Sequence, residues 1–261
     1  MKITLIGAGR LATHLGKALK EAGHDILQVY SRTMESASQL ASALDASATD
    51  NLARVGNGAD VYILSVKDSV LTSLIPTLCK GREDKVFLHT AGSMPMDVFA
   101  DAATHYGVFY PMQTFSKEKA VCFRDIPCFV EWTDSLAHDA VQSLAESVSN
   151  CVYPLSSADR KYLHLSAVFA CNFVNHCYAV SEDILASHHI PFSVMLPLID
   201  ETARKVHELS PRKAQTGPAV RFDENVINKQ ALLLQDEPLL QDIYTNMSKH
   251  IFEYAQNTEN K

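Results

Sequence analysis

The fold of this chain is decided by residues 2–12, which read KITLIGAGRLA. The apolar run Lys2–Ile6 predicts a buried strand, and Leu11–Glu21 predicts an amphipathic helix that ends before Gly23. Glycines in the turn between them permit a sharp bend and let a pyrophosphate approach the backbone, while an alanine keeps the helix close to the sheet. The turn therefore predicts a dinucleotide site, formed by Gly7, Ala8, Gly9, Arg10, Leu11 and Ala12.

Short apolar runs alternate with amphipathic stretches up to residue 154, which is typical of strands and helices in a parallel sheet. Beyond residue 157 the pattern is helical almost throughout. The predicted fold class is α/β, with a Rossmann-type, doubly wound, mostly parallel sheet followed by an all-helical domain. We expect the first domain over residues 1–153 and the helical domain over residues 154–261. The predicted strands are Lys2–Ile6, Ile26–Tyr30, Asp60–Val66, Val86–His89, Val108–Tyr110, Cys128–Trp132 and Cys151–Pro154.

Composition excludes several classes of partner. The net charge is -7 and no Lys/Arg cluster is longer than two residues, so neither a nucleic acid nor a membrane is expected as a partner. The six cysteines and 11 histidines lack the spacings of metal sites, so no metal is expected. No leader precedes the first predicted strand and no run of about 18 apolar residues occurs. We therefore expect a cytoplasmic protein that acts on a small-molecule substrate.

The end of the second predicted strand favours NADP over NAD. A carboxylate about 20 residues beyond the glycines is typical of NAD enzymes, where it binds the ribose hydroxyls. This chain has Ser31, Arg32 and Thr33 instead. Two hydroxyls and a guanidinium suit the 2′-phosphate of NADP, because arginine presents several donors to a dianion. The alternative is that Arg32 is a solvated surface residue.

Two further loops follow strands of the predicted sheet, where ligands of open parallel sheets bind. They contain Ser65, Val66 and Lys67 after one strand, and Thr90, Ala91 and Gly92 after another. Small residues there would let the nicotinamide ribose lie close to the backbone. Lys67 would bind the ribose hydroxyls, or, as the alternative, only begin a surface loop.

The helical pattern at residues 157–188 is apolar over most of its circumference, which favours burial in a dimer or a domain core. Its polar residues Lys161, His164, Asn172 and Asn175 fall within about a quarter turn at about 3.6 residues per turn. A reductase needs a proton donor, and histidine ordinarily titrates near neutrality. His164 is the predicted donor, Lys161 the second candidate, and Asn172 would orient the substrate. Structural hydrogen bonds between helices are the alternative.

A polar turn interrupts the later helices, at Thr216-Gly217-Pro218 with Arg221 and Asp223 beyond it. Thr216 and Arg221 are candidates for holding a substrate anion. A simple loop with a salt bridge is the alternative.

Taken in order, these segments resemble a family of NADP oxidoreductases built from a Rossmann-like domain and a helical domain. The resemblance also covers His89–Ser93 and Tyr110–Phe115, and it implies substrate binding by Gln113 and Thr114. Two positions depart from the family, which has a histidine at Tyr110 and a glycine at Phe222. More distantly, the chain is similar to pyrroline-carboxylate reductases, deazaflavin-dependent NADP reductases and β-hydroxyacid dehydrogenases. That similarity implies a helical domain like the C-terminal domain of 6-phosphogluconate dehydrogenase, and a homodimer.

The leading hypothesis is an NADP-dependent oxidoreductase that transfers a hydride between NADP(H) and a small carbonyl or imine compound. The competing hypothesis is a non-catalytic NADP(H)-binding sensor or scaffold dimer. A third is a Rossmann fold that holds another nucleotide, such as S-adenosylmethionine, which Ser31 and Arg32 disfavour.

Overall fold

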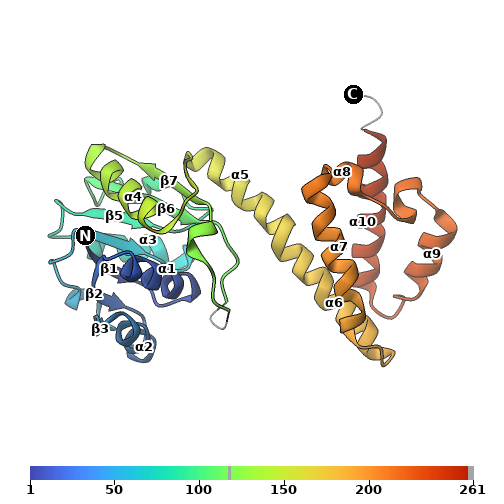
Figure 1. The fold of residues 1–261 in the computed structure, drawn as a ribbon, viewed down its shortest axis with the longest axis horizontal. Coiled ribbons are helices and arrows are strands. Elements are labelled where there is room, and N and C mark those ends of the chain that lie inside the picture. The colour runs from blue at the N-terminus through green and yellow to red at the C-terminus, as the bar shows by residue number, and fades with distance from the viewer. Residues whose placement is uncertain (117–118, 258–261) are drawn as a thin grey trace. The chain divides into compact units, whose positions relative to one another are not determined.

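The computed structural model describes residues 1–116 and 119–257. It divides into two compact units, residues 1–176 and 177–261. The first unit is an α/β sheet structure and the second is helical, as the sequence predicts (Figure 1). The domain boundary expected at residues 153/154 stays a prediction. The helical segment that begins at Ser157 runs on through residues 176 and 177, where the two units divide.

The first unit is built on one eight-stranded sheet with the order β3-β2-β1-β4-β5-β6-β7-β8. Neighbouring strands run parallel, except that β6 and β7 are antiparallel. The predicted Rossmann-type, mostly parallel sheet is therefore confirmed. The strands are β1 (Lys2–Ile6), β2 (Asp25–Tyr30), β3 (Ser47–Thr49), β4 (Val61–Leu64), β5 (Val86–His89), β6 (His105–Pro111), β7 (Cys128–Trp132) and β8 (Val152–Pro154).

Two apolar cores lie against the sheet, one on each face, because successive strand residues point to opposite sides. In β4, Ile63 packs into the core shared with α1, α2 and α4, whereas Tyr62 and Leu64 pack into the core shared with α3. In β5, Leu88 and Phe87 divide in the same way. These helices are α1 (Arg10–Glu21), α2 (Met34–Leu44), α3 (Asp68–Cys79) and α4 (Ser135–Val148).

Three strands differ clearly from the sequence-based expectation. Strand β4 covers Val61–Leu64 and is shorter than the predicted Asp60–Val66. The edge strand β3 was not predicted, because three residues of Ser-Ala-Thr carry no apolar run and join β2 by backbone pairing. Strand β6 begins three residues earlier than predicted, at His105, because its first residues pair with β5 in spite of their half-exposed side chains.

A long helical segment follows the sheet. Helix α5 (Ser157–Ala167) continues through a π-helical turn (Val168–Phe173) into α6 (Val174–Ser187). The sequence predicted an uninterrupted α-helix there. A π turn depends on tertiary packing rather than on residue type, and such turns occur often at functional sites. The helical unit continues with α7 (Leu196–Glu208), α8 (Pro211–Ala214), α9 (Glu224–Leu232) and α10 (Pro238–Gln256).

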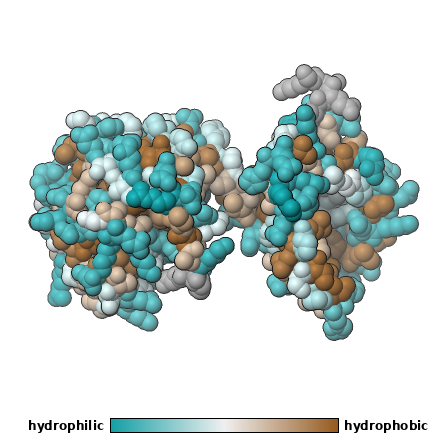
Figure 2. Space-filling model, in the orientation of Figure 1, coloured by the Kyte–Doolittle hydropathy of each residue, from teal (hydrophilic) through white to brown (hydrophobic). Residues whose placement is uncertain are grey.

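The helical unit has little core of its own. Among its described residues, 177–257, only Ala219, Ile227 and Ser248 are buried. Figure 2 shows apolar residues at the surface of this unit among hydrophilic ones. Within the described chain, no helix combines the length and apolar character needed to cross a membrane.

Candidate functional site

The strand order of the sheet reverses between β1 and β4, the position at which ligands of open α/β sheets bind. The loops after these two strands touch. Gly7 has a φ of 120°, and a Cβ built on it would lie 2.1 Å from the carbonyl oxygen of Ser65. Only glycine combines this backbone with such a close approach.

Gly9, unlike Gly7, has open space beside its Cα atom. It is the N-cap of α1, with a φ of -77°, and a Cβ built on it would meet no atom within 4 Å. In the described structure no side chain caps α1, and its first turn contains no acidic residue. The first amides of α1 and the partial positive charge of the helix are thus available to an anion, and the open space beside Gly9 fits a phosphate.

The loop after β2 holds the residues predicted to select NADP. The Ser31 amide donates to the carbonyl of Thr49, 3.1 Å away, which fixes the loop against β3. Thr33 is the N-cap of α2, where its hydroxyl accepts from the Ser36 amide, a structural role that the sequence analysis missed. Arg32 is exposed, and its guanidinium makes no hydrogen bond or ion pair within the described residues.

The loops after β4 and β5 are joined to each other. Lys67, exposed, is the N-cap residue of α3. Asp68 accepts a hydrogen bond from the Ser93 hydroxyl of the next loop. The two predicted ribose-binding loops therefore form one connected edge.

His89, at the end of β5, contacts the backbone of the loop that follows this strand. It is fully buried, its Nδ1 accepts from the Ala91 amide at 3.1 Å, and its Nε2 lies 3.3 Å from the carbonyl of Pro95. Burial, together with the charge of Arg160, lowers the pKa of His89 to about 4. The ring is therefore neutral near pH 7, with its proton on Nε2 for the bond to Pro95. No local sequence pattern indicates this role for His89.

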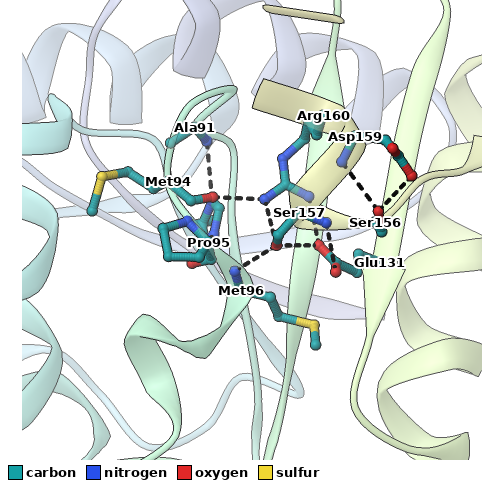
Figure 3. A network of polar contacts seen from close by, with 10 residues as sticks. Ala91, Met94, Pro95, Met96, Glu131, Ser156, Ser157, Asp159 and Arg160 are labelled. Carbon is teal, nitrogen blue, oxygen red and sulfur yellow. Dashed lines mark hydrogen bonds and ion pairs between the residues drawn. The ribbon is translucent and has the colours of Figure 1, made fainter. Parts of the chain in front are cut away.

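A buried ion pair fixes the start of α5 to the same loop (Figure 3). The Arg160 guanidinium donates to Glu131 of β7 and to the carbonyl of Met94, each at 2.6 Å. Ser157 donates from its amide and its hydroxyl to Glu131, and its hydroxyl oxygen accepts from the Met96 amide. This network was not predicted, since nothing in the local sequence pattern distinguishes Arg160 from a surface arginine.

His164, the predicted proton donor, lies against the loop after β5. A Cβ on Gly92 would fall 2.5 Å from its Nδ1. That nitrogen is also 2.9 Å from the hydroxyl of Tyr110, at the end of β6. Burial raises the pKa of Tyr110. A phenol and an imidazole thus meet at the loop predicted to hold the nicotinamide ribose.

The other members of the predicted polar stripe do not join this contact. Lys161 is exposed, with its Nζ 5.0 Å from the centre of the Tyr162 ring. Asn172 and Asn175 are exposed and lie within or after the π turn, which changes their angular relation to His164. Their catalytic or substrate-binding roles stay predictions.

Gln113 and Thr114 follow β6 and are exposed; the Gln113 side chain accepts from the Thr114 amide at 2.8 Å. Thr216 and Arg221 belong to the helical unit, where Asp223 serves as the N-cap of α9. Phe222 has a left-handed backbone with a φ of 50°, which is the physical reason a glycine suits this position. Among the described residues, no three histidine, cysteine, aspartate or glutamate side chains are grouped to hold a metal.

Two family models match parts of the chain. The model described as "NADP oxidoreductase coenzyme F420-dependent" matches residues 2–91. The model described as a domain of unknown function, DUF2520, matches residues 126–251. A comparison with curated proteins gave no match.

Solved structures are similar over nearly the whole chain. The "putative NADP oxidoreductase BF3122" from Bacteroides fragilis is 51% identical, with 97% of this chain and 98% of that chain covered and a TM-score of 0.93. An imine reductase from Myxococcus stipitatus, in complex with NADP+, is 14% identical, covering 100% and 94%, with a TM-score of 0.66. A 1-pyrroline-5-carboxylate reductase from Streptococcus pyogenes is 14% identical, covering 98% and 98%, with a TM-score of 0.63. The last two likenesses show the fold alone.

Proposed function

The chain belongs to the NADP oxidoreductase family that includes the Bacteroides fragilis protein, and from that premise we propose that it transfers a hydride between NADP(H) and a small carbonyl or imine compound. The bound nicotinamide would supply or accept the hydride, and the chain's own residues bind, orient and exchange the proton. The observation that carries the proposal is the position of His164 against Gly92, on the loop that follows β5.

The dinucleotide fits the residues that are present. Its pyrophosphate would lie beside Gly9, at the uncapped start of α1, where a Cβ would meet nothing. Ser31 and Arg32 would bind the 2′-phosphate of NADP, as the exposed guanidinium has no partner among the described residues. Ser65, Val66, Lys67, Thr90, Ala91 and Gly92 would line the nicotinamide ribose.

A carbonyl or imine substrate follows from the proton donor. Reduction of either group leaves a nitrogen or oxygen that must take up a proton, and an imidazole supplies one near neutral pH. His164 would be that donor, with Lys161 as the second candidate and Asn172 as an orienting group. The imine class is also favoured by the likeness to an imine reductase and to a 1-pyrroline-5-carboxylate reductase.

Turnover is the direct test. We expect pure protein with NADPH to reduce at least one member of a panel of keto acids, cyclic imines and deazaflavins. His164→Ala should lower the maximal rate by about 100-fold or more and leave NADPH affinity nearly unchanged. His138→Ala, which removes a half-exposed histidine from α4, is the matched control and should keep the full rate. Tight NADPH binding without turnover on any compound would support the sensor or scaffold instead.

The preference for NADP depends on Arg32. We expect Arg32→Ala to weaken NADPH binding by about tenfold or more, since charge-assisted hydrogen bonds contribute about 1.5–3 kcal/mol. NADH affinity should stay the same. Arg54→Ala, which makes the same charge change after β3, is the control in calorimetry. If Arg32→Ala weakened the binding of NADPH and NADH equally, Arg32 would not be the residue that binds the 2′-phosphate.

A homodimer is part of the proposal. Few residues of the helical unit are buried, while large apolar side chains such as Leu198, Leu233 and Leu239 are exposed. Large exposed apolar surfaces of this kind mark sites of protein–protein contact. A second copy of the chain would bury this apolar surface. Light scattering that finds only particles of 28.8 kDa would contradict the homodimer.

We further place the protein in the cytoplasm. Its six cysteines are all free thiols, which suits a reducing compartment. Fractionation of the source cells that recovers the protein outside the cytoplasm would contradict this placement.

A further inference from the structure

The contact between Tyr110 and His164 joins residues 54 positions apart in the sequence. The tyrosine hydroxyl lies 2.9 Å from Nδ1 of the imidazole, and the two rings meet edge to face at 5.9 Å. Tyr110 comes from the end of β6, and His164 from the second half of α5. The contact therefore connects the sheet to the helix that carries the proposed proton donor.

Both side chains are held from several sides. Tyr110 is 7% exposed and packs against Phe129 of β7, with ring centres 6.4 Å apart. A Cβ on Gly92 would come within 2.5 Å of the His164 ring and 3.0 Å of the Tyr110 ring. The loop thus closes on both rings and leaves no room for another side chain.

We infer that Tyr110 is a positioning residue of the proposed reaction, and that its oxygen holds Nδ1 of His164 so that Nε2 is the nitrogen that exchanges a proton with the substrate. This inference rests on the proposed function. An imidazole with one nitrogen engaged by a fixed partner has a defined orientation and a defined reactive nitrogen.

The proton balance follows from this arrangement. In the protonated ring, Nδ1–H donates to the tyrosine oxygen and Nε2–H faces the substrate. The Nε2 proton passes to the substrate nitrogen or oxygen, and the ring stays bonded to Tyr110 through Nδ1–H in its neutral form. Burial raises the pKa of Tyr110, so the phenol stays protonated and offers a neutral oxygen. Solvent then returns a proton to Nε2.

Tyr110→Phe tests the inference, because it removes the hydroxyl and keeps the ring that packs on Gly92. We expect kcat to fall about tenfold or more, as one fixed hydrogen bond orients the donor, with KM and NADPH affinity within about twofold. In the ¹⁵N spectrum of the full-length protein, the Nδ1 signal of His164 should move toward that of a ring with no partner. A tyrosine that only packs against the loop would affect stability and leave this signal unchanged, and a hydrogen bond that only stabilises the fold would leave kcat unchanged.

Tyr106→Phe is the matched control, since Tyr106 lies on the same strand and its hydroxyl has no hydrogen bond among the described residues. It should change neither kcat nor the His164 signal. An unmoved Nδ1 signal or an unchanged kcat in Tyr110→Phe would overturn the inference, even if His164→Ala is inactive. Full activity in His164→Ala would instead overturn the proposed donor, and the spectrum would still report whether the contact exists.

Discussion

Gly7→Ala should lower the free energy of unfolding by about 3 kcal/mol or more, the largest effect of any single methyl group in the proposed nucleotide site. Two costs add. The φ of 120° is unfavourable for alanine, and the new Cβ would lie 2.1 Å from the Ser65 carbonyl, a backbone atom that cannot rotate away. Urea unfolding at constant pH measures the loss, and calorimetry should find no NADPH binding because the loops after β1 and β4 must separate.

Gly9→Ala is the matched comparison within the same turn. Its φ of -77° suits any residue and its Cβ would meet nothing within 4 Å. The unfolding free energy should change by less than about 1 kcal/mol, whereas NADPH affinity should fall by at least about tenfold because the methyl group fills the space of the pyrophosphate. Equal stability of Gly7→Ala and the unchanged protein would contradict the close approach. Unchanged NADPH affinity in Gly9→Ala would show that the pyrophosphate does not bind at the start of α1.

Glu131→Gln should lower the free energy of unfolding by about 3–5 kcal/mol, because it leaves the buried charge of Arg160 without a counter-ion. The Arg160 side chain is 1% exposed and that of Glu131 is 18% exposed, so water cannot replace the lost partner. Since the pair also fixes the Met94 carbonyl and α5, NADPH should protect this variant less against heating than it protects the unchanged protein.

Glu201→Gln provides the control for this pair. It neutralises the partner of Arg204 on α7, where the side chains are 48% and 64% exposed. Solvent screens exposed pairs, so this change should cost less than about 1 kcal/mol. Urea unfolding measures the free energy of unfolding of both variants. Similar small decreases in the two variants would mean that the Arg160–Glu131 pair is hydrated in solution.

The α/β architecture was predictable because its signals are local. Strand β1, the glycine turn and α1 are contiguous, and a period of about two residues in strands or about 3.6 in helices is visible without knowing any long-range contact. The edge strand β3 was missed for the converse reason. Its three residues gain their structure from backbone pairing with β2, which leaves no mark on the side-chain pattern.

The candidate site was predictable in part. Positions at the carboxyl ends of strands follow from topology, so Gly9, Arg32 and Gly92 could be placed at one edge before the fold was known. His164 was selected for its chemistry and for a helical stripe, yet the π turn at Val168–Phe173 separates that stripe into two parts. Pattern analysis assumes one helical period, and a single wider turn changes which side chains align.

Local sequence accounts for the Rossmann-type sheet and for the glycine turn after β1, because both depend on neighbours in the chain and on the special backbone of glycine. Long-range packing brings Tyr110 to His164, pairs Arg160 with Glu131, and leaves His89 buried and neutral. Each of these facts depends on which side chains distant segments bring together, and that depends on the packing of the whole unit rather than on any local pattern.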